Sequence, residues 1–141
     1  MIQLYDFLRL LPLYVFCFIG SFLFHELGHI KCSSLKDTGN IQVFRYGFAA
    51  SRDNKSNDWW FFLAGGLLAG VLYITIGLLC WYDSVVQLCL FTAGIVNICY
   101  GPFEMYYLPR WGSGDKRYKY GRYSIYIIVT IVCLIMGVYL L

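Results

Sequence analysis

Four long apolar segments constrain the fold of this chain more than any other feature. About 20 apolar residues match the thickness of a bilayer core, and such segments lie at about residues 8–30, 59–80, 84–108 and 123–141. The 141 residues are 60% hydrophobic and 13% charged, with a mean hydropathy of +0.62, which is typical of multi-pass membrane proteins rather than soluble domains. We therefore expect one all-helical domain over residues 1–141, with about four transmembrane helices.

Aromatic side chains mark the ends of these segments. Trp and Tyr rings favour the headgroup zone of a bilayer, so their clustering at the proposed ends agrees with a count of four membrane spans. The residues concerned are Trp59, Trp60, Trp81, Tyr82, Tyr106, Tyr107, Trp111 and Tyr123.

Basic residues predict the orientation of the chain. All Lys and Arg residues except Arg9 lie in the connections 31–58 and 109–122, whereas the short connection between the second and third segments has only Asp83. The positive-inside rule then places both basic connections on the cytoplasmic or equivalent side. Because the basic residues are split between two membrane-flanking loops, we expect the bilayer, and no nucleic acid, as a partner.

Both histidines of the chain lie in one pentapeptide, His25-Glu26-Leu27-Gly28-His29, at the end of the first apolar segment. On a helix, positions i and i+4 share a face, so His25 and His29 can bind one metal ion. A catalytic zinc lowers the pKa of its water to about 7, and a nearby carboxylate such as Glu26 can accept the proton. The motif therefore predicts a metallopeptidase.

The membrane setting strengthens this prediction. Placing an ionisable group inside a membrane-spanning helix costs free energy, so a cluster of such groups indicates a functional site. The alternative is a polar patch at the helix end, in which backbone carbonyls satisfy the two imidazoles.

The third metal ligand must come from the same level of another helix. A carboxylate completes the two-histidine set of hydrolytic zinc sites, and the candidates at that level are Glu104 and Asp115. Asn97 lies about two helical turns before Glu104. Cys32, three residues after His29, is a further candidate.

The order of the motifs resembles the site-2 protease family of intramembrane zinc metalloproteases. The histidine motif is followed by the glycine-rich segment 63–70, then by Asn97, by Pro102 and Pro109, and by Gly112-Ser113-Gly114-Asp115. The resemblance covers most of the chain.

This resemblance implies a zinc ion bound by His25, His29 and Asp115, with Glu26 as catalytic acid and base and Asn97 assisting at the active site. The chain departs from the family pattern at two places: Asp115 is followed by Lys116 instead of glycine, and the second segment lacks the family's Gly-Pro and nearby Asn. Glu104 therefore stays open as the third ligand.

Two further features have alternative explanations. The small residues Gly65, Gly66, Ala69 and Gly70 predict close helix packing, although they could instead permit a local helix break beside the zinc. In the connection 32–58, residues 41–48 predict a short strand or hairpin. Its edge could pair with an extended substrate, or the connection could simply cap the bundle.

Together these features predict an intramembrane zinc endopeptidase that cleaves a peptide bond in or near a transmembrane segment of another protein, with its active site toward the cytoplasmic side and with possible partner subunits. One alternative is an inactive protease-fold subunit that acts as a membrane assembly or scaffold protein. Another is a membrane zinc hydrolase of a different lineage, such as a protease acting on lipidated termini, whose third ligand is usually a glutamate.

Overall fold

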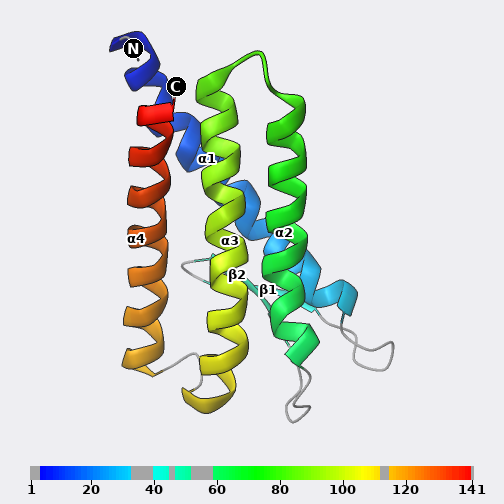
Figure 1. Cartoon of the computed structure of the whole chain (residues 1–141). Helices are drawn as coiled ribbons and strands as arrows, with labels where there is room; N and C mark the ends of the chain where they lie inside the picture. Colours follow the sequence, from blue (N-terminus) through cyan, green and yellow to red (C-terminus); the bar gives the residue numbers. More distant parts are fainter. Residues whose placement is uncertain (1–3, 33–39, 45–46, 52–58, 112–114, 141) are drawn as a thin grey trace.

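The computed structural model describes residues 4–32, 40–44, 47–51, 59–111 and 115–140 (Figure 1). Within these residues the fold is all-helical apart from one hairpin, as the sequence predicted. The elements in chain order are α1 (Leu4–Cys32), β1 (Asn40–Phe44), β2 (Gly47–Ser51), α2 (Trp59–Leu79), α3 (Ser84–Trp111) and α4 (Lys116–Leu140).

Three of the helices contain segments that are long and apolar enough to cross a membrane, judged by length and composition. These segments are Leu8–His29 in α1, Ser84–Leu108 in α3 and Lys116–Gly137 in α4. The described part of α2 contributes a shorter apolar segment, Leu63–Leu79. The chain is therefore compatible with a membrane protein.

Helix α4 begins at Lys116, before the apolar segment at about residues 123–141 that the sequence predicts as a membrane span. The reason is the cap at its start: Asp115 Oδ1 accepts a hydrogen bond from the backbone N–H of Arg117 at 2.7 Å, which satisfies one of the free donors of a helix N-terminus. The charged residues that follow Asp115 therefore form the first turns of the helix instead of a loop.

Helix α3 is the centre of the bundle, because it packs against α1, α2 and α4. In Figure 1 the helices run up and down, α1 crosses behind α2 and α3, and the two ends of the chain lie at the same end of the bundle. Helices α1 and α4 meet through side chains: Tyr14 and Thr130 share a hydrogen bond of 2.6 Å, and the rings of Phe18 and Tyr126 are 5.4 Å apart.

The turn between α2 and α3 is fixed by Asp83. Its Oδ1 accepts hydrogen bonds from the backbone N–H groups of Val85 and Val86, each at 3.1 Å, and so caps α3. Its Oδ2 accepts a hydrogen bond of 2.6 Å from Arg9 on α1. These hydrogen bonds lower the pKa of Asp83, and the bond from Arg9 has the largest effect. The same bond from Arg9 connects the first turns of α1 to this turn.

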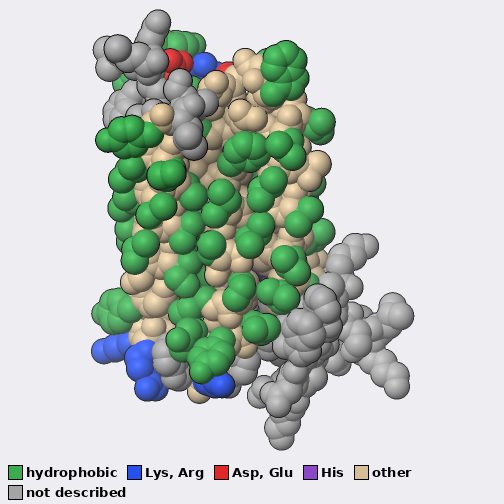
Figure 2. Space-filling view, in the orientation of Figure 1, with side chains coloured by type: hydrophobic (Ala, Val, Ile, Leu, Met, Phe, Trp, Pro, Cys, Tyr) green, Lys and Arg blue, Asp and Glu red, His purple; other side chains and the backbone are tan. Residues whose placement is uncertain are grey.

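The outer wall of the bundle is apolar. Hydrophobic side chains cover it between the two ends, and Lys and Arg side chains gather at the end where α4 begins (Figure 2). Trp81 and Tyr82, predicted to lie at a membrane interface, are 77% and 76% exposed at the opposite end. Exposed side chains also line α4 along its length: Tyr123, Ile127, Ile128, Ile131, Val132, Ile135, Met136 and Tyr139.

The glycines of α2 allow close helix packing. A Cβ atom on Gly66 would lie 2.5 Å from the backbone oxygen of Asn97 and 2.7 Å from the Cα atom of Gly101 on α3. Such a close approach of two backbones suits helices that have no hydrophobic drive for association in lipid. Because α2 is continuous from Trp59 to Leu79, the alternative of a local helix break is wrong.

Candidate metal centre

A row of polar side chains runs along one face of α1. Ser21, His25 and His29 follow one another at four-residue spacing, which places them one above the other on a helix. All three are buried, with exposed fractions of 0%, 2% and 3%. This row faces the interior of the bundle while neighbouring apolar residues such as Phe16 and Leu23 are exposed.

A matching row lies on α3. Asn97, Tyr100 and Glu104 are spaced at i, i+3 and i+7, and all three are buried. Because α2 reverses the chain between them, α1 and α3 run in the same direction (Figure 1). His25 and Glu104 lie at one level, because His25 Nε2 is 2.9 Å from Glu104 Oε2.

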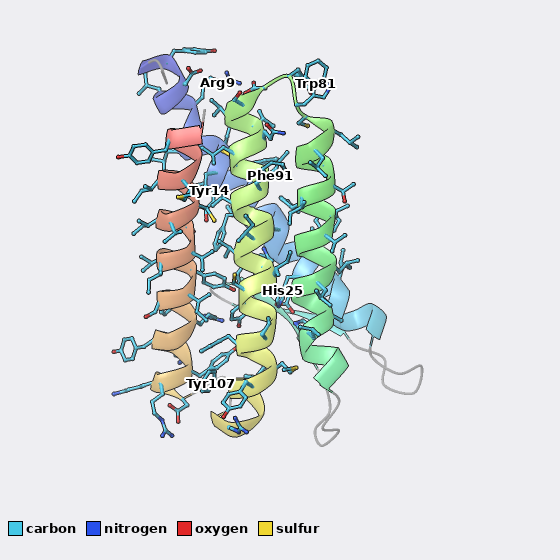
Figure 3. All side chains as sticks on the ribbon, in the orientation of Figure 1. Arg9, Tyr14, His25, Trp81, Phe91 and Tyr107 are labelled. Carbon is cyan, nitrogen blue, oxygen red and sulfur yellow. The ribbon has the colours of Figure 1, made fainter. Side chains whose placement is uncertain are left out.

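Three side chains converge at this level. Glu104 Oε2 lies 2.9 Å from His25 Nε2 and 3.4 Å from His29 Nε2, and the two imidazole centroids are 4.7 Å apart. Each of the three residues offers one possible ligand atom, and these three atoms lie within 4.8 Å of one another. Figure 3 shows His25 inside the bundle, in the half away from Arg9 and Trp81.

The donor set fits a zinc ion. Two imidazole nitrogens and one carboxylate oxygen form a common ligand set of hydrolytic zinc sites. Donors bound at about 2.1 Å to a tetrahedral zinc are about 3.4 Å apart, which is the separation of His29 Nε2 and Glu104 Oε2. The 2.9 Å between His25 Nε2 and Glu104 Oε2 is that of a hydrogen bond, so these two groups would have to move apart by about half an ångström to share the ion.

Asn97 holds the imidazole of His25 from the other side. Its Oδ1 lies 3.2 Å from His25 Nδ1, while its Nδ2 donates to Ser21 Oγ at 2.9 Å and to the backbone oxygen of Ala93 at 2.8 Å. The bond to the Ala93 carbonyl identifies the nitrogen of the amide, so the oxygen faces His25 and accepts from Nδ1–H. This arrangement directs Nε2 toward the converging donors, as the outer partners of metal-binding histidines do.

Helix α2 forms the third wall of the site. A Cβ atom on Gly65 would lie 2.6 Å from His29 Nε2 and 2.8 Å from the backbone oxygen of His25. A Cβ atom on Gly28 would lie 2.6 Å from the backbone oxygen of Ala64. The histidine motif is thus packed directly on the backbone of α2, and only glycine leaves room for the imidazole at this contact.

The structure brings together most, but not all, of the residues singled out in the sequence. His25 and His29 converge, and Glu26, buried with 7% exposure, follows His25 in the chain. Asn97 also lies at the site, but as the support of His25, with both of its amide hydrogens bonded to the protein.

Asp115, expected as the third ligand, is not in this cluster. It caps α4, and its Oδ2 accepts a hydrogen bond of 2.9 Å from Arg117, which lowers the pKa of Asp115. Because α3 continues to Trp111, the residue at the level of the histidines is Glu104. The side chain of Cys32 and residues 112–114 lie outside those described.

Sequence reasoning did not single out Ser21, Tyr100 or Tyr118. The ring of Tyr100 lies 5.3 Å from that of His25, and its hydroxyl is 2.5 Å from the hydroxyl of Tyr118 on α4. Two of these residues could have been found from their spacing. Ser21 lies four residues before His25, and Tyr100 lies between Asn97 and Glu104. For Tyr118 the sequence carries no such signal.

Comparison of the chain with family models, with curated proteins and with solved structures finds no match.

Proposed function

We propose that this chain is a membrane-embedded zinc peptidase whose metal ligands are His25, His29 and Glu104 and whose catalytic acid and base is Glu26. The observation that carries this proposal is the convergence of two Nε2 atoms and one carboxylate oxygen in the interior of an apolar bundle. Ionisable groups gathered in such a place are expensive and mark a functional site.

Zinc bound by these residues would lower the pKa of a water molecule and polarise the peptide carbonyl. Glu26 would take a proton from the attacking water as the oxygen of that water adds to the carbonyl carbon and the π electrons of the carbonyl move to the carbonyl oxygen. When the C–N bond then breaks, Glu26 returns the proton to the amine nitrogen. Asn97 would keep the imidazole of His25 oriented through its hydrogen bond to Nδ1.

The proposed substrate is a transmembrane segment of another protein. Support comes from the apolar wall of the bundle and from the depth of the site among helices that could span a membrane. The basic end of the bundle would face the cytoplasm or its equivalent, and water would enter the site from that side. This proposal makes the chain similar in chemistry to the site-2 proteases.

The hairpin offers a place for the substrate backbone. Strands β1 and β2 pair with each other in antiparallel register and pack against α1, the helix that carries the histidines. Among the described residues the outer edge of each strand has no strand partner. An unwound substrate segment could add to such an edge through main-chain hydrogen bonds, as in other cases of strand addition.

One observation favours a second candidate. A glutamate as third ligand is the feature expected of a membrane zinc hydrolase of another lineage, such as a protease acting on lipidated termini, and Glu104 holds that position here. The two candidates share the metal and the role of Glu26. They differ in the substrate: an apolar spanning helix in one case and a lipid-modified chain end in the other.

The test compares the purified wild type with Glu26→Ala. Zinc content is measured in both, together with cleavage of a library of membrane-spanning peptides and of a set of prenylated peptides in liposomes. We expect zinc in both proteins and turnover in the wild type alone, and the cleaved peptide class decides between the two candidates. Absence of turnover in both proteins would indicate the scaffold alternative, and absence of zinc in the wild type would contradict the proposed metal centre.

A further inference from the structure

The proposed reaction needs a hydrogen-bond donor for the negatively charged oxygen that forms on the attacked carbonyl, and Asn97 does not supply it. Both hydrogens of its amide group are committed, one to Ser21 Oγ and one to the backbone oxygen of Ala93. Its oxygen is committed to His25. A donation from Asn97 to substrate would break the network that orients His25.

A pair of tyrosine hydroxyls offers an uncommitted donor. Tyr100 on α3 and Tyr118 on α4 are buried, with exposed fractions of 3% and 2%, and their hydroxyl oxygens are 2.5 Å apart. Each hydroxyl carries one hydrogen, and the bond between them uses one of the two. Within the described part of the chain, the second hydrogen has no acceptor.

The pair lies at the metal centre. Tyr100 sits on the same face of α3 as Asn97 and Glu104, between them in the sequence, and its ring packs on that of His25 at 5.3 Å. Tyr118 approaches from α4, and its ring stacks on Phe103 at 5.7 Å with an interplanar angle of 22°.

We infer that Tyr100 donates a hydrogen bond to the carbonyl oxygen of the substrate as it becomes negatively charged, and that Tyr118 positions Tyr100 by donating to its hydroxyl oxygen. This inference rests on the proposed peptidase function. Tyr100 is given the contact with substrate because its ring packs on that of His25, whereas Tyr118 is hydrogen-bonded to Tyr100 and stacks on Phe103. Neither tyrosine loses its proton: they stabilise the tetrahedral adduct, and Glu26 carries the transferred proton.

The hydrogen bond from Tyr118 to Tyr100 would make the Tyr100 hydroxyl a stronger donor. A hydroxyl that accepts one hydrogen bond is polarised and donates a stronger one, so chains of hydrogen bonds strengthen one another in a medium of low dielectric constant. Donors already aimed at the developing charge also need no reorganisation during the reaction. Loss of one such donor costs about 100-fold to 1,000-fold in kcat.

The experiment uses the full-length protein in liposomes, a spanning peptide that the wild type cleaves, and the phosphonamidate analogue of that peptide, whose charged oxygens imitate the adduct. The variants are Tyr100→Phe and Tyr118→Phe, which keep the rings, with Tyr126→Phe as the matched control. Tyr126 packs on Tyr100 at 4.9 Å but is not part of the hydroxyl pair.

For Tyr100→Phe we expect kcat to fall about 100-fold or more, with KM and zinc content within about twofold of the wild type. Affinity for the phosphonamidate should fall by the same factor as kcat/KM, because both measure binding of the transition state. Tyr118→Phe should show a smaller loss than Tyr100→Phe, because it removes only the strengthening that a neighbouring hydrogen bond gives. Tyr126→Phe should match the wild type.

The outcomes separate this inference from the proposed function. An active wild type with a fully active Tyr100→Phe variant would overturn the role of the tyrosines and leave the peptidase proposal intact. A loss of kcat without loss of phosphonamidate affinity, or a loss of zinc in Tyr100→Phe, would show a structural role and also overturn it. An inactive wild type would overturn both proposals.

Discussion

Glu104 Oε2 lies 2.9 Å from His25 Nε2, although 79 residues separate the two in the chain. The contact joins α1 to α3 inside the bundle, since both helices run in the same direction and carry these residues at the same depth. A metal ion held there would connect the two helices through their side chains. Metal binding should therefore stabilise the folded bundle as well as create the proposed active site.

The first prediction concerns the identity of the third ligand. Glu104→Ala should abolish zinc binding, because two imidazoles alone leave the ion without its anionic ligand. Asp115→Asn should retain full zinc content, because Asn can still cap α4 and the carboxylate of Asp115 bonds Arg117, not the metal centre. Zinc is measured by elemental analysis of the purified proteins, and unfolding temperature with and without added zinc gives a second readout.

Zinc should raise the unfolding temperature of the wild type and of Asp115→Asn. For a ligand at 100 times its Kd, the stabilisation is about 2.7 kcal/mol. Loss of zinc in Asp115→Asn, together with its retention in Glu104→Ala, would restore the ligand set that the family resemblance implied.

Much of this architecture could be predicted from the sequence, because the length and composition of each apolar segment are local properties that do not depend on tertiary contacts. The i, i+4 spacing of His25 and His29 is local, and so their convergence was predictable too. The choice between Glu104 and Asp115 was not. It depends on where α3 ends and on how it is rotated about its axis.

Neither of these properties can be read from an apolar helix. The polar residues of α3 are not confined to the row of Asn97, Tyr100 and Glu104, because the helix also carries Gln87, Thr92 and Arg110. No single polar face therefore defines its rotation. The start of α4 at Lys116 could not be read from the sequence, because its first turns are charged and the helix begins there with the cap by Asp115. The contact of Tyr100 with Tyr118 joins two helices and is invisible to any local pattern.

The second prediction concerns the wall formed by α2. Gly65→Ala places a methyl group 2.6 Å from His29 Nε2 and 2.8 Å from a backbone oxygen of α1, so the imidazole or the helix must move. We expect zinc affinity to fall by about tenfold or more, as when partners that orient a metal ligand are disturbed. Affinity is measured by competition with a chelator of known zinc affinity.

Gly101→Ala is the matched control for this substitution. Its methyl group would lie no closer than 3.4 Å to any of its nearest neighbours, which is ordinary van der Waals contact, and these neighbours belong to Gly66 and Leu63 and not to a histidine. This variant should bind zinc as the wild type does. Equal affinity in both glycine variants would show that the imidazole can shift without cost.

A third prediction addresses the support of His25. Asn97→Ala removes the acceptor of the His25 Nδ1–H group and leaves the imidazole free to rotate or to change tautomer. Zinc affinity should fall about 10-fold to 100-fold, with the helical content of the protein unchanged. The same chelator competition measures the affinity, and circular dichroism gives the helical content.

Ser21→Ala tests how far this support extends. It removes one of two acceptors of the Asn97 amide while the bond to the Ala93 carbonyl remains, so the loss in zinc affinity should be smaller than that of Asn97→Ala. A larger loss in Ser21→Ala would contradict the order of these contacts, in which Asn97, and not Ser21, is hydrogen-bonded to the imidazole.

The last prediction concerns pH and the opposite end of the bundle. The hydrogen bond from Arg9, followed by those from the backbone of α3, lowers the pKa of Asp83 below its ordinary value of 3.8. The folded protein therefore holds the proton of Asp83 less tightly than the unfolded chain, so this group's contribution to stability is complete above about pH 4 and is lost as the pH falls through the lowered pKa.

The measurement is the unfolding temperature in detergent at about pH 7 and about pH 3. Between these two values it should drop more for the wild type than for Asp83→Asn, which caps α3 but cannot ionise. Every other carboxylate is common to both proteins, so an equal drop in the two would show that the Arg9–Asp83 pair does not contribute to the pH dependence of folding.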